Sequence, residues 1–115
     1  MKITLGDVVF SNENLYDFEC AMSIGSPTEG YRELAASEVG LLLDLIALVV
    51  STRATVEQCP FIIAPVFTTT SDGIMMTSGY NIAITREGER RVDLTVPGGP
   101  NAITACINAV TGGEY

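Results

Sequence analysis

The sequence predicts an α+β fold, in which an antiparallel sheet of about five strands carries two helices packed mainly on one face. Segments with alternating apolar residues, typical of strands, lie in both halves of the chain. Two further segments carry helix-start signals or a helical apolar stripe. Turn residues separate neighbouring strand segments closely enough for hairpins. The predicted order is β-β-α-β-β-β-α, in one compact domain over residues 1–115.

The first two predicted strands, residues 2–10 and 16–24, form an antiparallel hairpin around the turn-forming segment 11–14. Apolar residues before and after Gly6-Asp7 alternate in opposite phases. A bulge at this dipeptide would bring both sets to one face of the sheet, because one extra residue shifts the phase. Residues 16–24 alternate without interruption, which is typical of a half-buried strand.

The first helix is predicted to begin at Ser26, because Ser26, Pro27 and Glu29 occupy the N-cap, N1 and N3 positions of a capping box. We expect it to run to about Arg53 and at most to residue 58, since Cys59-Pro60 disfavours helix. Its second half is apolar nearly all round, which predicts burial on more than one side, either by the sheet and another layer or by a partner chain.

Three more strands are predicted at residues 61–68, 74–85 and 90–96, with a turn at 69–73. Pro65 lacks an amide hydrogen, so the strand that contains it must be an edge strand or bulged there.

The last hairpin allows its register to be predicted from residue parity. Directly opposed residues in a hairpin have a constant sum of numbers, and all of the expected inward residues have even numbers. An odd loop is therefore required, with Glu87-Gly88-Glu89 the simplest choice and Arg86 opposite Arg90. The expected inward residues are Tyr80, Ile82, Ile84, Val92, Leu94 and Val96.

A second helix is predicted from about Pro100 to Val110, with Gly112 at its C-terminal cap. Ile103, Cys106, Ile107 and Val110 form its apolar stripe at helical spacing.

Composition excludes several function classes. Six basic and 14 acidic residues give a net charge of −8, and Lys2 is the only lysine. Such a surface repels nucleic-acid phosphates and anionic lipid, so we expect no direct nucleic-acid binding. The apolar run at residues 40–50 is shorter than the roughly 20 residues of a membrane span, so no membrane partner is expected either.

The sequence contains no histidine, which excludes Ser-His-Asp and Cys-His nucleophiles and His-ligated zinc or haem. We therefore predict a non-enzymatic protein with no catalytic residues, no metal site and no cofactor. Cys20, Cys59 and Cys106 form no CxxC motif. We expect them to be reduced and mostly buried, which predicts a reducing, cytoplasmic compartment or subunits made there and then assembled.

Asp7, Asp17 and Glu19 are the candidate partner-binding residues. Pairing Phe10 with Tyr16 places Asp7 across from Glu19 on the outer face of the first hairpin, with Asp17 diagonal to it. Carboxylates held together in this way would suit a basic protein surface. The alternative is a solvated strand face without a binding role.

Three other features have the residue types of a binding site but favour a structural role. The turn Gly98-Gly99-Pro100 could cradle an anion at a helix N-terminus, but it matches no phosphate-binding motif. The hydroxyl-rich segments 68–73 and 77–80 are typical of turns. Asp44 lies inside the apolar run, where a raised-pKa acid or a solvent-facing residue is possible.

The leading functional hypothesis is a small acidic protein that binds a basic surface on another macromolecule, by analogy with inhibitors, immunity proteins and phage accessory proteins of this size and charge. The alternative is a structural protein that assembles with its own copies, as in a virion or ring, because its apolar helix and proline-bearing strand could be covered by a neighbour. A small-ligand binder or carboxylate-based enzyme is the third hypothesis.

Overall fold

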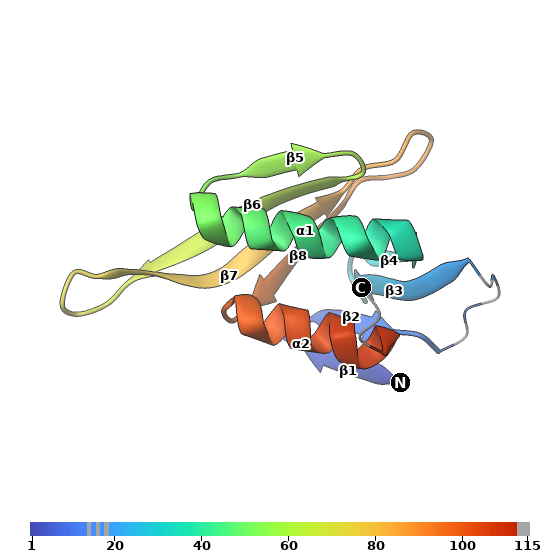
Figure 1. Ribbon diagram of the computed structural model, residues 1–115, viewed down its shortest axis with the longest axis horizontal. Helices are drawn as coiled ribbons and strands as arrows, with labels where there is room; N and C mark the ends of the chain where they lie inside the picture. Colours follow the sequence, from blue (N-terminus) through green and yellow to red (C-terminus); the bar gives the residue numbers. More distant parts are fainter. Residues whose placement is uncertain (14, 16, 18, 113–115) are drawn as a thin grey trace.

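The computed structural model describes residues 1–13, 15, 17 and 19–112. The fold is α+β, as predicted, but it contains two four-stranded antiparallel sheets instead of one sheet of about five strands (Figure 1). The elements in chain order are β1 (Lys2–Leu5), β2 (Val8–Ser11), β3 (Cys20–Ser26), β4 (Gly30–Ala35), α1 (Ala36–Thr52), β5 (Val56–Gln58), β6 (Phe61–Thr69), β7 (Met75–Ile84), β8 (Val92–Pro97) and α2 (Pro100–Thr111).

The first sheet, in the order β1-β2-β3-β4, corrects the prediction for the N-terminal segment. Gly6-Asp7 forms a tight turn between two strands and not a bulge within one, with Gly6 at a φ of 63°. The phase change in the sequence therefore marks a chain reversal, which pairs Ile3 with Phe10. Phe10 pairs on its other side with Ile24 of β3, and its predicted partner Tyr16 lies outside the described residues.

The predicted helix start at Ser26 is wrong. The hydrogen bond expected of a helix cap does form at Ser26, but it closes the turn between β3 and β4. The backbone N–H of Glu29 donates to Ser26 Oγ at 3.1 Å, and the chain then enters β4 through Gly30 at a φ of 89°. A Cβ on Gly25 would lie only 2.2 Å from the Gly30 carbonyl oxygen, so glycine permits the close approach of β3 and β4.

The helix α1 starts ten residues later than Ser26, at Ala36. Glu38 provides the capping interaction there, since its Oε1 accepts the backbone N–H of Ala35 at 3.0 Å. The helix ends at Thr52, close to the predicted end, and Arg53 adopts a left-handed conformation. Strand β5, which follows, was not predicted.

The second sheet, in the order β5-β6-β7-β8, confirms the parity prediction. Ile84 pairs with Val92, Ile82 with Leu94 and Tyr80 with Val96, so opposed residues have the predicted constant sum. Gly88 adopts a φ of 80° in the connecting loop. All six predicted inward side chains are buried: Tyr80, Ile82, Ile84, Val92, Leu94 and Val96.

Pro65 lies inside β6, which is both bulged and partly an edge strand, as its proline requires. The register of β6 against β7 shifts between Val66 and Phe67. On the other side of β6, pairing with β5 ends at Ile63. Residues 64–69 therefore lie beyond the end of β5, on the side of β6 away from β7.

The two helices lie side by side in one layer against the sheets (Figure 1). Helix α1 packs on β5 and β6 and also contacts β3 and β4, whereas α2 packs on β1, β2 and β3. Asn12, just after β2, donates from Nδ2 to the carbonyl oxygen of Val110 at 2.9 Å. Helix α2 confirms its predicted bounds and its cap at Gly112, which has a φ of 82°. The helices and both sheets thus enclose one shared core.

Within one copy, α1 is buried on one side, and among the described residues no second layer covers its other side; cover by a partner chain stays a prediction. Val39, Leu42, Leu45, Ile46 and Val49 face the core, but Leu48 and Val50 are 45% and 44% exposed. Helix α1 therefore presents apolar side chains to solvent near its C-terminal end.

Candidate interaction surface

The outer part of the β6–β7 hairpin projects beyond the helices as a two-stranded arm (Figure 1). We use the name arm for residues 67–77, which lie beyond the bulge between Val66 and Phe67. Within the arm, Phe67 pairs with Thr77 and Thr69 with Met75. The molecule measures 49 × 29 × 26 Å along its principal axes, and the arm lies at one end. A two-stranded ribbon has little stability by itself, so the arm depends on contacts at its base or with a partner.

The tip of the arm carries three consecutive large apolar residues that are exposed. Ile74, Met75 and Met76 are 60%, 52% and 55% accessible to solvent. Adjacent residues of a strand point to opposite faces, so Met75 and Met76 expose apolar surface on both sides of the ribbon. Burial of such side chains stabilises a contact by about 1.5–3 kcal/mol each when it is complete. The tip is therefore a favourable site for contact with another surface.

Arg53 joins the arm to the end of α1. Its guanidinium lies 5.2 Å from the centroid of the Phe67 ring, in a cation–π arrangement. Its Nη2 also donates to the carbonyl oxygen of Met75 at 3.3 Å. These two contacts join both strands of the arm to the residue that ends the helix, so they orient the arm relative to α1.

At the end of the arm, the Thr70 hydroxyl forms a hydrogen bond within its own turn. The backbone N–H of Ile74 donates to Thr70 Oγ1 at 3.2 Å, and the N–H of Thr70 donates to the Ile74 carbonyl oxygen at 2.8 Å. The N–H of Gly73 completes the turn by donating to the Thr70 carbonyl oxygen. The Thr70 hydroxyl is thus part of the scaffold that presents Ile74.

A groove of about 390 Å³ lies between α1 and α2. The residues that line it from α1 are apolar, whereas those from α2 include two amides and a hydroxyl. Asp44 is exposed on α1 but does not line the groove. The lining residues are Leu43, Ile46, Ala47, Val50, Pro100, Asn101, Thr104 and Asn108, none of which is charged.

The structure separates the three predicted partner-binding residues. Asp7 is exposed in the β1–β2 turn, near Ser26 at one end of β3. Asp17 and Glu19 are exposed just before Cys20 at the other end, where the Glu19 N–H donates to Asp17 Oδ1 at 2.9 Å. The length of β3 corresponds to about 20 Å at ~3.3 Å per residue. The predicted pairing of Asp7 with Glu19 is therefore wrong, because the actual register pairs β2 with the far half of β3.

Asp7 instead lines a hollow of about 230 Å³ together with Glu29 and Asp93. The carboxylate of Glu29 is already engaged, since its Oε1 accepts the Asp93 backbone N–H at 3.0 Å. Asp93 also pairs with Arg91 at 2.9 Å. Among the described residues, no group of three His, Cys, Asp or Glu side chains could hold a metal ion.

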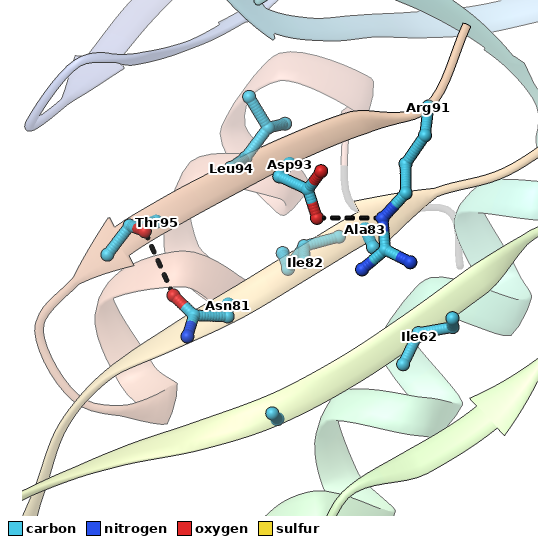
Figure 2. A pocket seen from close by; sticks show the side chains of 9 residues that line it. Ile62, Asn81, Ile82, Ala83, Arg91, Asp93, Leu94 and Thr95 are labelled. Carbon is cyan, nitrogen blue, oxygen red and sulfur yellow. Dashed lines mark hydrogen bonds and ion pairs between the residues drawn. The ribbon is translucent and has the colours of Figure 1, made fainter.

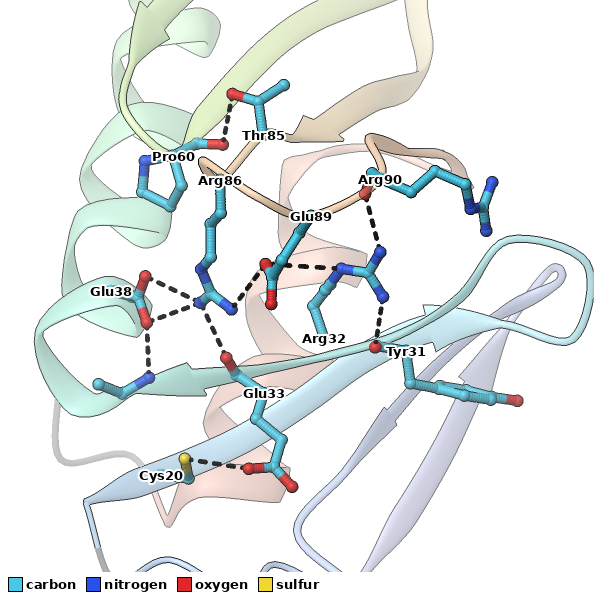
Figure 3. A network of polar contacts seen from close by, with 11 residues as sticks. Cys20, Tyr31, Arg32, Glu33, Glu38, Pro60, Thr85, Arg86, Glu89 and Arg90 are labelled. Atoms are coloured by element: carbon cyan, nitrogen blue, oxygen red, sulfur yellow. Dashed lines mark hydrogen bonds and ion pairs between the residues drawn. The ribbon is translucent and has the colours of Figure 1, made fainter.

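A polar network joins the β7–β8 loop to β4 and to the start of α1 (Figure 3). Arg86 Nη2 donates to both carboxylate oxygens of Glu38 at 2.9 Å and to the Glu33 carbonyl oxygen at 2.8 Å. Arg32 donates to the Arg90 carbonyl oxygen at 2.8 Å. Because each guanidinium already faces carboxylate or carbonyl oxygens, the network connects the two sheets and leaves no converging free groups for a substrate.

The thiol of Cys20 belongs to the edge of this network. Its Sγ donates to Glu33 Oε2 at 3.3 Å. Burial, this hydrogen bond and the negative charges of Glu33 and Asp17 raise the pKa of Cys20 to about 11. Burial also raises the pKa of Cys106. Cys20 and Cys106 are only half-buried and Cys59 is exposed, so the expected burial of the cysteines is wrong for Cys59; all three are free thiols.

A shallow hollow of about 370 Å³ lies on the outer face of the second sheet (Figure 2). Its polar side chains bind one another: Thr95 Oγ1 donates to Asn81 Oδ1 at 2.9 Å, and Arg91 Nε donates to Asp93 Oδ1 at 2.9 Å. The Gly98-Gly99-Pro100 turn is similar, since the Gly98 N–H donates to the Ser78 carbonyl oxygen. Neither place gathers free groups toward one point, as a ligand site would.

No protein-family model, curated protein or solved structure matches the chain. None of the helices in the described ranges has the length and apolar character needed to cross a membrane.

Sequence reasoning missed the arm as a candidate surface, although a signal was present. Ile74, Met75 and Met76 directly follow Gly73, and three consecutive large apolar residues cannot all face the same side of a strand. At least one of them must therefore point away from the core.

Proposed function

We propose that the protein is a non-enzymatic structural subunit that associates with copies of itself through the arm. The observation that carries this proposal is the exposed apolar tip formed by Ile74, Met75 and Met76 on a projecting hairpin. Exposed apolar residues that cluster at one place mark contact sites more often than singly scattered ones.

The open edge of β6 supports the same proposal. Residues 67–69 of the arm lie beyond the end of β5, so the arm offers an open strand edge as well as apolar side chains. Sheet edges of this kind are sites at which proteins pair with another chain. The arm thus combines two features that favour association.

Sedimentation velocity over protein concentrations from about 1 μM to about 1 mM tests the proposal. Wild-type protein should shift to larger species as concentration rises. Ile74→Lys should weaken this association by about tenfold or more, because a charged side chain would be desolvated in the contact. Thr4→Lys on β1 is the matched control, since it adds the same charge at an exposed strand position away from the arm. A monomer at every concentration, or equal effects of both variants, would refute the proposal.

A basic surface on a different protein is the second candidate partner. It is favoured by the net charge of −8 and by exposed Asp17 and Glu19, which lie within one short segment. Charge of this kind acts mainly on the association rate. Asp17→Asn and Glu19→Gln should then slow capture of the basic partner at low salt, whereas Asp7→Asn, 20 Å or so away along β3, should not. Unchanged association rates in the first two variants would exclude this segment as the site.

A further inference from the structure

We infer that two copies of the protein pair through the open edge of β6, antiparallel to each other and about a twofold axis at Thr68. This inference rests on the proposed self-association and adds the partner surface and its register. The edge is the side of β6 away from β7, beyond the point where pairing with β5 stops. Unpaired strand edges are surfaces through which separate chains join their sheets.

The hydrogen bonds at the two ends of β6 show which of its backbone groups face this edge. The Pro60 carbonyl oxygen accepts the Thr85 N–H at 2.7 Å, and the Thr70 N–H donates to the Ile74 carbonyl oxygen at 2.8 Å. Even-numbered residues thus direct their backbone groups toward β7, and alternation directs those of odd-numbered residues to the other side. The extra residue at the register shift is Ser78 of β7, so the alternation along β6 is unbroken.

The odd-numbered residues of β6 differ in what lies beside them. Phe61 and Ile63 are paired with β5, whereas Pro65 has no N–H to donate. Phe67 and Thr69 each direct an N–H and a carbonyl oxygen to an edge along which no other strand of the described residues lies. These four groups are therefore the ones that a further strand can bond.

A twofold pairing centred on Thr68 satisfies all four groups. Phe67 of each copy then lies opposite the partner's Thr69, in an antiparallel pair that exchanges two hydrogen bonds. A centre at residue 66 would instead place Pro65, which cannot donate, opposite Phe67. Because the edge pairs with an identical edge, every contact occurs twice, as in a closed dimer.

Charge selects a second copy as the occupant of this edge. The register places the partner's Asp72 opposite Ala64, just beyond the last residue of β6 that pairs with β5. The exposed residues 53–55 connect α1 to this end of β5. Within the described part of the chain, neither Arg53 nor Asp72 belongs to an ion pair. The pairing thus brings the only charged residue of each arm toward an arginine of the other copy.

The β7 edge of the arm is less open than the β6 edge. Arg53 Nη2 already donates to the Met75 carbonyl oxygen at 3.3 Å, and the Gly98 N–H donates to the Ser78 carbonyl oxygen at 2.8 Å. The arm projects beyond both helices and beyond β5, so its β6 edge can meet a second arm (Figure 1).

The pairing also covers part of the apolar surface of the arm. Opposed residues of an antiparallel pair have their side chains on the same face, so Phe67 lies beside the partner's Thr69. Within each arm Thr69 is paired with the exposed Met75, which lies one strand further on that face. The aromatic ring of one copy and the methionine of the other thus lie on the same face of the joined sheet.

Disulfide trapping tests the register directly. Each variant also carries Cys59→Ser, which removes the exposed native thiol. Thr68→Cys places two thiols across the twofold axis, in a non-hydrogen-bonded pair whose Cα atoms lie about 4.5 Å apart, within the range of a disulfide. Met76→Cys is the control, because it lies on the same face but both β6 strands separate its two copies. Oxidised glutathione should link the Thr68→Cys copies about tenfold or more faster than the control copies. Mass spectrometry identifies the linked residues.

Exchange of charges tests the contact between the arm and the end of α1. Asp72→Arg and Arg53→Asp each bring like charges together when a variant pairs with itself, so each should weaken self-association by about fivefold or more. An equimolar mixture of the two restores opposite charges at both contacts and should associate more strongly than either variant alone. Asp44→Arg, exposed on α1 away from the arm, is the control and should restore nothing when mixed with Arg53→Asp.

The outcomes separate this inference from the proposed function. Self-association in which residues 68 and 76 are linked at equal rates, or in which the mixture gains nothing, overturns the edge pairing and leaves the proposed function standing. A wild-type protein that stays monomeric overturns both.

Discussion

Arg86 and Glu38 are joined by two hydrogen bonds, with Nη2 of Arg86 2.9 Å from each carboxylate oxygen of Glu38. Both side chains are about three-quarters buried. Glu38 also caps α1 through the Ala35 N–H, so one carboxylate connects the helix start to the loop between β7 and β8. The pair thereby ties the helix that follows the first sheet to a loop of the second.

We predict that Arg86→Met lowers the free energy of unfolding by about 1–2 kcal/mol, because it removes charge-assisted hydrogen bonds to Glu38 and to the Glu33 carbonyl oxygen. Arg91→Met removes the same charge from a more exposed pair with Asp93 and should cost less than about 0.5 kcal/mol. Urea denaturation of both variants measures the difference. Equal losses would show that the Arg86 network adds nothing beyond a surface ion pair.

Alanine substitutions at Gly88 and Gly40 distinguish the energetic effect of backbone conformation from that of packing. A Cβ on Gly88 or on Gly40 would meet nothing within 4 Å, but only Gly88 has a positive φ, of 80°. Gly88→Ala should therefore destabilise the fold by about 1–2 kcal/mol. Gly40→Ala, inside α1, should stabilise it by up to about 1 kcal/mol. Thermal unfolding of both variants gives the two signs, and a stabilised Gly88→Ala protein would contradict the loop conformation.

The raised pKa of Cys20 predicts slow thiol chemistry. With a pKa of about 11 against an ordinary value of 9.0, the native thiolate fraction near neutral pH falls about a hundredfold. Labelling of Cys20, followed by mass spectrometry, should thus be much slower in the native than in the unfolded chain. Glu33→Gln should accelerate it by removing the Glu33 charge. If Cys20 labels at the unfolded rate, the contact with Glu33 does not form in solution.

The same shift predicts a pH dependence of stability. The native state favours the protonated thiol, so the stabilising contribution is complete below pH 9.0 and is lost as pH rises toward 11. Cys20→Ser should reduce this alkaline loss of stability relative to wild type. Denaturant unfolding at several pH values between these limits provides the measurement, and identical pH profiles would argue against the prediction.

Arg53 combines a backbone role with a contact role, and two substitutions distinguish them. Arg53→Ala keeps the left-handed φ of 55° unfavourable and loses the contacts to Phe67 and Met75. Arg53→Gly loses the same contacts but favours that conformation. The glycine variant should therefore be more stable than the alanine variant by about 1 kcal/mol. In both, amide hydrogen exchange in the arm should speed up. An unchanged exchange rate would mean that Arg53 does not hold the arm.

Sequence patterns predicted the β7–β8 hairpin of the second sheet well because its signals are local and consistent. Even-numbered apolar residues on both sides of Glu87-Gly88-Glu89 leave one register that buries them all, and the structure adopts it. Pro100, the apolar stripe and Gly112 likewise indicate the same start, buried face and end for α2. Where every local feature favours the same structure, sequence alone suffices.

The first sheet was harder to predict because its local signals are ambiguous. Ser26 with Glu29 is compatible with a helix cap and with a strand turn, and the same hydrogen bond forms in either case. Tertiary packing decides between them, since Leu34 is fully buried beside Met22 of β3. Gly25 and Gly30, which allow β3 and β4 to approach closely, were the available signal for the hairpin.

The candidate surface was predictable only in part for a related reason. The predicted acidic residues depended on a register that the β1–β2 turn changes, so Asp7 moved away from Asp17 and Glu19. The apolar tip could be recognised without knowing any strand register, but its exposure depends on how far the hairpin extends beyond the helices. That distance follows from the assembled fold and not from any one segment.

The packing of α2 on the first sheet has a consequence for how the chain is made. Strands β1 to β3 are complete by Ser26, yet the helix that packs on them spans residues 100–111 and leaves the ribosome only after about 70 further residues have been made. During synthesis the apolar face of this sheet therefore stays uncovered by α2 until that distant segment is made. Contacts of long sequence separation also form slowly. A chain ending at residue 99 should bind a hydrophobic fluorescent dye strongly, and addition of a peptide with the α2 sequence should reduce that binding. Weak dye binding by the shortened chain would show that the sheet is protected without its helix.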